Sequence, residues 1–388
     1  MSTTHVFIVD INTFKYHLEY LFAGTGAKDN FVDFNNNTQT SLHPITENNL
    51  VSMIADLCRV RKDDFVIFYL QKEKNKVWEG KFYGIFQIKD DFPFLDNNDD
   101  DQFLKNELEK SLTFRTLIQP YEVYAEGVSE WEALDEIKDI QSPFKMLWSL
   151  IYRKLKGNRG NTMITIYESE RLFELLRDKN NRQTLSGNKY TFDIQSQKII
   201  ASDTIYNYTG RKTRLDILPR LINKYPKPPE THLQAYIVQN IGKNTNPSLD
   251  SCLLNNLGFE WMGNEVSCGV GMQKIDIMLS LNIPNNRIIV PIELKAVEAT
   301  EDNIIQVKRY VNWLEQYYIP NININITSDI QPVLISKTIS DKNSAKYRDI
   351  VESFKIFNQT NNRCLPLKYI EYHLDNSNLL FEAINYDL

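Results

Sequence analysis

The sequence predicts two domains of different class, a mainly β domain followed by an α/β domain whose mixed sheet is flanked by helices. Strand patterns dominate the first 125 residues, and the order helix, three strands, helix, strand begins at Glu230. A basic stretch that ends in prolines lies between the two patterns. We therefore expect a first domain over residues 1–200, a linker over 201–229 and a second domain over 230–388.

Length and composition are those of a globular protein. The chain has 388 residues, of which 42% are hydrophobic and 24% charged, and this length suits two domains. No run approaches the roughly 18 apolar residues of a membrane span and no secretory segment stands near Met1, so we expect a cytoplasmic protein without membrane contact. The scattered cysteines and histidines indicate neither disulfides nor zinc.

In the first domain, alternating apolar residues predict strands at 5–11, 65–70, 81–88 and 113–123. The spacing of Leu50, Ile54 and Leu57 predicts a helix over 48–58. The acidic cluster at 96–101 lacks the glycine and the terminal glutamate of an EF-hand loop, so we expect a solvated loop there. Helical patterns follow at 128–137, 144–155 and 168–177.

Two basic stretches are candidate contacts for a DNA backbone. The first stretch begins at the end of the helix predicted at 144–155. Cations at a helix C-terminus stabilise the helix dipole, which explains Arg153 and Lys154 but not Arg159, which lies beyond Gly157. The second is the linker 201–229, where a basic segment is often only a soluble connection. Because this linker directly precedes the second domain, we predict phosphate contacts in both stretches, at Arg153, Lys154, Lys156, Arg159, Arg211, Lys212 and Arg214.

The second domain begins with an amphipathic helix over 230–240. Strands are predicted at 259–270, 275–283 and 287–294, the last two joined by a Pro-Asn-Asn turn. A helix over 302–318, a strand over 331–339, a helix over 345–357 and β-like segments at 367–372 and 379–383 complete the domain. This order indicates a mixed sheet with helices on its faces.

Ionisable residues stand in two of these strands where apolar residues are expected. Asp276 lies at the head of one strand, and Glu293 and Lys295, two residues apart, share one face of the next. Two carboxylates can hold Mg²⁺ or Mn²⁺, and a lysine can orient the attacking water or offset negative charge. The alternative is a solvated strand end with a cross-sheet ion pair, but the apolar flanks would make that burial cost several kcal/mol.

The order Glu230 on a helix, then Asp276, then Glu293-Leu294-Lys295 resembles the core of PD-(D/E)XK nucleases. Residues of about 230–340 resemble more narrowly the C-terminal nuclease domain of the NucS/EndoMS DNA endonucleases, through KIDI, IELKA and the pair Gln306 and Tyr310. The resemblance implies that Asp276 and Glu293 bind the metal, that Glu230 assists, that Gln306 and Tyr310 line the site, and that Lys295 is the catalytic lysine. The N-terminal half does not resemble that family, so its substrate does not carry over.

The segments RVRKDDFVIFYLQ and KFYGIFQI resemble PUA-like domains of the EVE and YTH kind. Such a domain is a curled β-barrel, here with appended helices, and the resemblance implies an aromatic pocket for a flipped base, often a modified one. The candidate wall residues are Tyr69, Trp78, Tyr83 and Trp131. For each ring taken alone, packing in the core is the competing interpretation.

Together these features predict a Mg²⁺-dependent DNA endonuclease of restriction type, whose first domain reads a site or a modified base and whose second domain cuts double-stranded DNA. A homodimer would supply the two active sites that duplex cleavage requires. Two alternatives remain open, a structure- or mismatch-specific repair endonuclease and a non-catalytic reader of nucleic acid.

Overall fold

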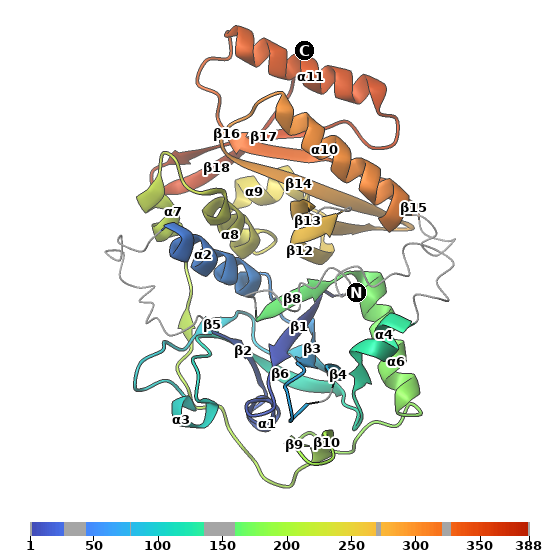
Figure 1. Ribbon diagram of the computed structural model, residues 1–388. Helices are drawn as coiled ribbons and strands as arrows, with labels where there is room; N and C mark the ends of the chain where they lie inside the picture. The colour runs from blue at the N-terminus through green and yellow to red at the C-terminus, as the bar shows by residue number, and fades with distance from the viewer. Residues whose placement is uncertain are drawn as a thin grey trace. The chain divides into compact units, whose positions relative to one another are not determined.

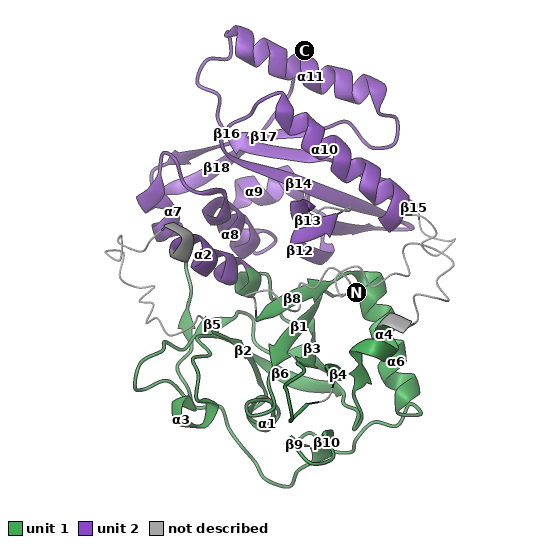
Figure 2. Ribbon diagram, in the orientation of Figure 1, with its two compact units in different colours: residues 1–42, 56–141, 145–216 green, residues 43–55, 142–144, 217–388 purple. Residues whose placement is uncertain are grey.

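The computed structural model describes residues 2–26, 44–77, 79–135, 160–268, 273–319 and 327–386. It divides the chain into two compact units (Figure 2). The first unit takes in residues 1–42, 56–141 and 145–216, and the second residues 43–55, 142–144 and 217–388. Within the described ranges, no helix is both long and apolar enough to cross a membrane.

The boundary between the units differs from the one that the sequence predicts. Residues 201–216 belong to the first unit, and the chain from Ile217 belongs to the second, so the stretch 201–229 is not a separate linker. Two short elements lie within it: strand β11 (Thr213–Arg214), which pairs with β5 (Phe94–Leu95), and helix α7 (Leu218–Lys224).

Helix α2 (Pro44–Cys58) supplies most of its length to the second unit, although the sequence places it in the first domain. The buried carboxylate of Glu47 binds Arg220 of α7 at 2.7 Å and His232 of α8 at 3.0 Å. These contacts attach α2 to the second unit, although α2 is far from the rest of that unit in the sequence.

The first unit is built on a nine-stranded sheet in the order β11-β5-β6-β4-β3-β1-β8, with β2 paired to β6 and β7 to β4 (Figure 1). Parallel β1 and β3 lie within an otherwise antiparallel arrangement. The strands are β1 (Thr4–Val9), β2 (Phe22–Thr25), β3 (Phe65–Leu70), β4 (Lys81–Ile88), β5 (Phe94–Leu95), β6 (Phe114–Glu122), β7 (Val128–Ser129), β8 (Asn161–Ile164) and β11.

The predicted barrel is not closed among the described strands. The edge strands β8 and β11 are four and two residues long and do not pair with each other, and a barrel needs its two edges to pair. The first unit is therefore an open sheet, and its PUA-like character stays a prediction.

Alternate residues of β1 and β3 enter two different hydrophobic clusters, as the period of two in a strand requires. Phe7 and Phe68 pack on one face, with α1 (Phe14–Glu19) and the separate hairpin of β9 (Tyr190–Asp193) and β10 (Lys198–Ala201). Val6 and Ile67 pack on the other face, with α6 (Ile166–Lys179). The remaining described helices of this unit are the short α3 (Lys105–Leu108) and α4 (Glu130–Asp135).

The second unit holds a seven-stranded mixed sheet in the order β12-β13-β14-β16-β17-β18, with β15 paired to β14 (Figure 1). The β14, β16 and β17 strands are parallel neighbours, whereas β12, β13 and β14 form antiparallel pairs. The strands are β12 (Phe259–Cys268), β13 (Gln273–Ile283), β14 (Asn286–Glu298), β15 (Thr327–Ile330), β16 (Val333–Lys337), β17 (Lys368–Asp375) and β18 (Asn378–Ile384).

Helices flank this sheet, so the prediction of a mixed sheet with helices is confirmed. Helix α10 ends one turn before the predicted boundary and continues as a π-helical segment, η4. The PD-(D/E)XK assignment stays a prediction. The helices besides α7 and most of α2 are α8 (Glu230–Asn240), α9 (Pro247–Leu253), α10 (Asp302–Trp313), η4 (Leu314–Tyr318) and α11 (Ala345–Thr360).

Candidate functional site

Asp276 lies at the end of the ladder between β13 and β14. The last backbone pair joins Ile277 to Ile292, and beyond it the carboxylate of Asp276 accepts a hydrogen bond from the backbone N–H of Leu294 at 2.8 Å. The side chain thus takes the place of a missing ladder bond and is fixed beside the neighbouring Glu293.

Glu293 is the buried centre of the site, with 1% of its surface exposed. One carboxylate oxygen lies 2.7 Å from the ammonium of Lys295, and the other accepts a hydrogen bond from the hydroxyl of Tyr310 at 2.6 Å. The structure therefore brings together a glutamate and a lysine that strand alternation places on one face, and adds a tyrosine from α10.

Glu230 reaches the same cluster from α8, of which it is the first residue. Its carboxylate lies 3.4 Å from the ammonium of Lys295, and its side chain is 45% exposed. Lys295 thus stands between a buried glutamate and a solvated one.

Burial and neighbouring charges shift the pKa values of Asp276 and Lys295. Burial raises the pKa of Asp276 well above its usual value, and the negative charge of Glu293 raises it further. Burial alone would lower the pKa of Lys295, but its hydrogen bond and ion pair with Glu293 prevail and raise that pKa. Lys295 is therefore a cation at neutral pH, which suits it to stabilise negative charge and not to accept a proton.

The donor set fits Mg²⁺ or Mn²⁺ held in part by a substrate. Among the described residues, no three His, Cys, Asp or Glu side chains converge closely enough to hold a metal. Mg²⁺ is commonly bound by one or two carboxylates together with substrate phosphates and water. Asp276 and Glu293 would supply those carboxylates, and a divalent cation would relieve the repulsion that raises the pKa of Asp276.

Gln234 is a neighbour of the site that the sequence did not single out. Its amide donates a hydrogen bond to the backbone carbonyl of Asp276 at 2.8 Å, and its buried Oε1 has no hydrogen-bond partner among the described residues. A polar residue between Leu233 and Ala235, both buried, is the signal that could have drawn attention to it.

Gln306 does not contact the acidic cluster through any described hydrogen bond. It lines a small pocket of about 130 Å³ together with Gln273, Lys274, Arg309 and Tyr310. Tyr310 joins this pocket to the cluster, because its hydroxyl lies 2.8 Å from the carbonyl of Lys274 as well as beside Glu293.

The aromatic base pocket predicted in the first unit is not formed by the residues named for it. Tyr69 and Tyr83 are core residues, and their hydroxyls donate hydrogen bonds to Glu130 at 2.9 Å and to the carbonyl of Gln197 at 2.7 Å. Trp131 is 65% exposed, and Trp78 lies outside the described residues. The prediction failed for the two tyrosines because rings that fill a core and rings that line a pocket follow the same strand pattern.

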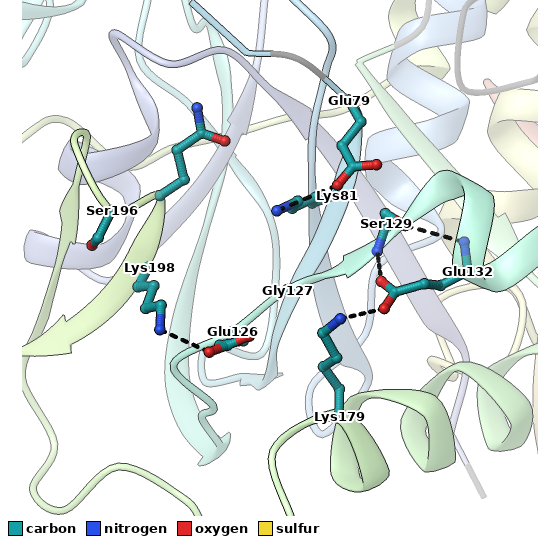
Figure 3. Close-up of a pocket in the computed structure, with 10 residues that line it drawn as sticks. Glu79, Lys81, Glu126, Gly127, Ser129, Glu132, Lys179, Ser196 and Lys198 are labelled. Atoms are coloured by element: carbon teal, nitrogen blue, oxygen red, sulfur yellow. Dashed lines mark hydrogen bonds and ion pairs between the residues drawn. The ribbon is translucent and has the colours of Figure 1, made fainter.

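A polar pocket of about 310 Å³ lies beside Gly127 in the first unit (Figure 3). A Cβ added at Gly127 in its wall would come within 2.7 Å of the Tyr83 ring, so that ring lies behind the wall. None of the described residues that line this pocket is aromatic. Its charged side chains are balanced, because each glutamate has a lysine partner, in the pairs Glu79 with Lys81, Glu126 with Lys198 and Glu132 with Lys179.

The basic residues predicted to contact DNA have different surroundings. Arg211 binds Asp99 at 2.5 Å and Asp96 at 3.2 Å, and Lys212 binds Asp90 at 2.9 Å. Arg211 therefore binds two carboxylates of the stretch 96–101, which the sequence suggested was only a solvated loop, and Asp96 is fully buried. Arg214 is exposed, with its guanidinium 5.7 Å from the Phe92 ring centroid. The positions outside the described residues are Arg153, Lys154, Lys156 and Arg159.

Comparisons with known proteins do not place the chain in a family. No protein-family model and no curated protein matches it. Among solved structures it is similar to a hypothetical protein from Leishmania major, with 9% identity, a TM-score of 0.28, and coverage of 46% of this chain and 97% of that one. It is also similar to human THYN1 in complex with DNA containing 5-methylcytosine, with 10% identity, a TM-score of 0.24, and coverage of 45% and 96%. TM-scores of this size do not establish a shared fold.

Proposed function

We propose that the second unit is a Mg²⁺-dependent DNA endonuclease that hydrolyses phosphodiester bonds. The observation that carries this proposal is the buried cluster in which Glu293 binds both Lys295 and Tyr310 next to Asp276. Two neighbouring carboxylates and one ammonium group, among apolar residues, are costly to bury for structure alone. They are suited to a ligand that is both metal-bound and anionic.

The residues of the cluster have different roles in the proposed hydrolysis. In this reaction the oxygen of a water forms a bond to phosphorus while the bond from phosphorus to the leaving sugar oxygen breaks. Lys295, a cation held by Glu293, stabilises the negative charge that grows on the phosphate oxygens. Glu230, half exposed at the start of α8, accepts the proton that the water loses.

Asp276 and Glu293 would hold the divalent cation, which when bound polarises the phosphate and lowers the pKa of water. The bond from Leu294 N–H to Asp276 and the bond from Tyr310 to Glu293 orient these two carboxylates. Supporting bonds of this kind fix the ligand geometry on which metal affinity depends.

The first unit would select the DNA, which makes the whole chain an enzyme of restriction type acting on double-stranded DNA. Support for this part comes from the resemblance of its strands to PUA-like domains and from the polar pocket beside Gly127. That pocket presents carboxylates and ammonium groups, so it would recognise a ligand by hydrogen bonds to its edge. A homodimer would place two active sites on the two strands.

One substrate panel tests the proposal. The purified chain is incubated with Mg²⁺, Mn²⁺ or EDTA and with unmodified, methylated, hydroxymethylated, mismatched and forked duplexes, beside the Lys295→Ala variant. Metal-dependent cutting of unbranched duplex that Lys295→Ala loses supports the proposal. Cutting confined to forks or mismatches identifies a repair endonuclease instead. DNA binding without cutting of any substrate identifies a non-catalytic reader.

A further inference from the structure

We propose that the pocket formed by Gln273, Lys274, Gln306, Arg309 and Tyr310 binds a second phosphate of the DNA strand, next to the phosphate that is cut. This inference rests on the proposed function, because it assigns a further part of the substrate to a surface beside the same site. No sequence pattern assigned Lys274, Arg309 or Gln273 to a site.

The lining of this pocket has the chemistry of an anion site. Its described lining residues supply two cations and two amides, and none of them is a carboxylate. The larger pocket of the first unit differs in this respect, since three glutamates there balance three lysines. A site with donors and positive charge but no acid favours a phosphate over a cation or a zwitterion.

Position and size also fit a backbone phosphate. Tyr310 connects the pocket to the acidic cluster, because its side chain lines the pocket and its hydroxyl donates a hydrogen bond to Glu293. The pocket volume of about 130 Å³ equals roughly four water molecules at about 30 Å³ each. This is room for a phosphate group but not for a base pair, so a strand whose one phosphate lies over Lys295 can place a neighbouring phosphate here.

Arg309 is the residue best placed to make the contact. It follows Gln306 by three positions on α10 and so lies on the same helix face. Arg309 is exposed and makes no ion pair among the described residues, whereas Lys274 is paired with Glu265 at 2.6 Å. A phosphate would therefore meet a guanidinium with which no carboxylate of the described residues forms an ion pair.

Lys308 provides the matched control. It is an exposed cation on the same helix, one position before Arg309, but it does not line the pocket. Lys308→Ala and Arg309→Ala thus remove the same charge from adjacent positions. Arg309→Lys keeps the charge and reports whether the planar guanidinium is needed.

The test measures duplex binding by the full-length chain in EDTA, where no cutting occurs, at a series of salt concentrations. The slope of log K against log salt changes by about 0.9 for each phosphate contact. We expect Arg309→Ala to reduce the slope by about that amount and to weaken binding for all sequences alike. Lys308→Ala should leave the slope unchanged, and melting curves confirm that each variant is folded.

Equal slopes for wild type and Arg309→Ala, equal losses in both alanine variants, or no DNA binding by the wild type would each overturn the phosphate pocket. Failure of the nuclease proposal has a different signature. In that case the Arg309-dependent slope persists while no substrate is cut with Mg²⁺. If DNA is cut but the slope does not depend on Arg309, the pocket assignment alone is wrong.

Discussion

The surroundings of Asp276 shift the pKa of its carboxyl group in both directions. Burial and the charge of Glu293 raise its pKa, while the hydrogen bond from Leu294 N–H lowers it by a smaller amount. A carboxyl group of this kind is protonated more readily in the folded chain than in the unfolded one. Its contribution to stability is therefore complete below the unfolded pKa and is lost as the pH rises through the folded pKa.

The substitution Asp276→Asn should raise the thermal stability of the metal-free protein at neutral pH, because it removes a buried charge but keeps the size of the side chain. The same variant should lose the stabilisation that Mg²⁺ gives the wild type, about 2.7 kcal/mol at a concentration 100 times Kd. Melting temperatures in EDTA and in Mg²⁺ check both effects. An equal Mg²⁺ shift in both proteins would contradict the assignment of Asp276 as a ligand.

Some contacts of the site follow from spacing, and others do not. Strand alternation places Glu293 beside Lys295, and the structure joins them at 2.7 Å. The bond from Leu294 N–H to Asp276 depends on where the ladder ends, which no residue pattern records. For the same reason, the sequence could not show that Tyr69 and Tyr83 belong to the core, because only tertiary packing decides which face of a strand is covered.

The carboxylate of Glu47 ties helix α2 to two other helices of the second unit, through Arg220 of α7 and His232 of α8. Burial alone would raise the pKa of Glu47, but hydrogen bonds from His232 and Arg220 outweigh it and lower that pKa from 4.5 to about 2. A lowered pKa contributes stability above the unfolded pKa and loses it as the pH falls toward the folded one. The attachment of α2 should therefore weaken between about pH 4.5 and pH 2.

We expect Glu47→Gln to destabilise the second unit by about 3 kcal/mol at pH 7, because the variant removes the carboxylate that pairs with the buried guanidinium of Arg220. Urea unfolding at pH 7 and pH 3 measures this, and the difference between variant and wild type should shrink at the lower pH. Glu315→Gln is the control, since Glu315 forms an exposed pair with Arg363 and its loss should cost less than about 1 kcal/mol. Equal losses in the two variants would show that the Glu47 network does not anchor α2.

Over the whole chain, the order of helices and strands was largely predictable from the sequence, but the division of the chain into two units was not. Strands β3 and β4 occupy the predicted ranges, and the mixed sheet of the second unit follows the predicted order. The sequence did not predict that α2 belongs mostly to the second unit, because this depends on contacts of Glu47 with two residues more than 170 positions away. The sequence pattern around Glu47 does not identify partners that are so far away along the chain.

A fragment of residues 201–388, cut at the boundary that the sequence suggests, lacks the part of α2 that belongs to the second unit. We expect this fragment to melt at a lower temperature than the same unit in the full chain, because Arg220 and His232 lose Glu47. A peptide of residues 43–58 added to the fragment should restore part of the loss, and a Glu47→Gln peptide should not. A fragment as stable as the full chain, and indifferent to both peptides, would contradict this account.

The most direct test of the central claim compares two glutamates of strand β14. Single-turnover cleavage of plasmid DNA in Mg²⁺ is measured for wild type, Glu293→Gln and Glu298→Gln. Glu293 lies buried against Lys295 and Tyr310, whereas Glu298 binds Lys346 at 2.9 Å at the surface. We predict that Glu293→Gln lowers the cleavage rate by at least about 100-fold and that Glu298→Gln cuts at the rate of the wild type. Equal rates for wild type and a folded Glu293→Gln variant would contradict the assignment of phosphodiester hydrolysis to this site.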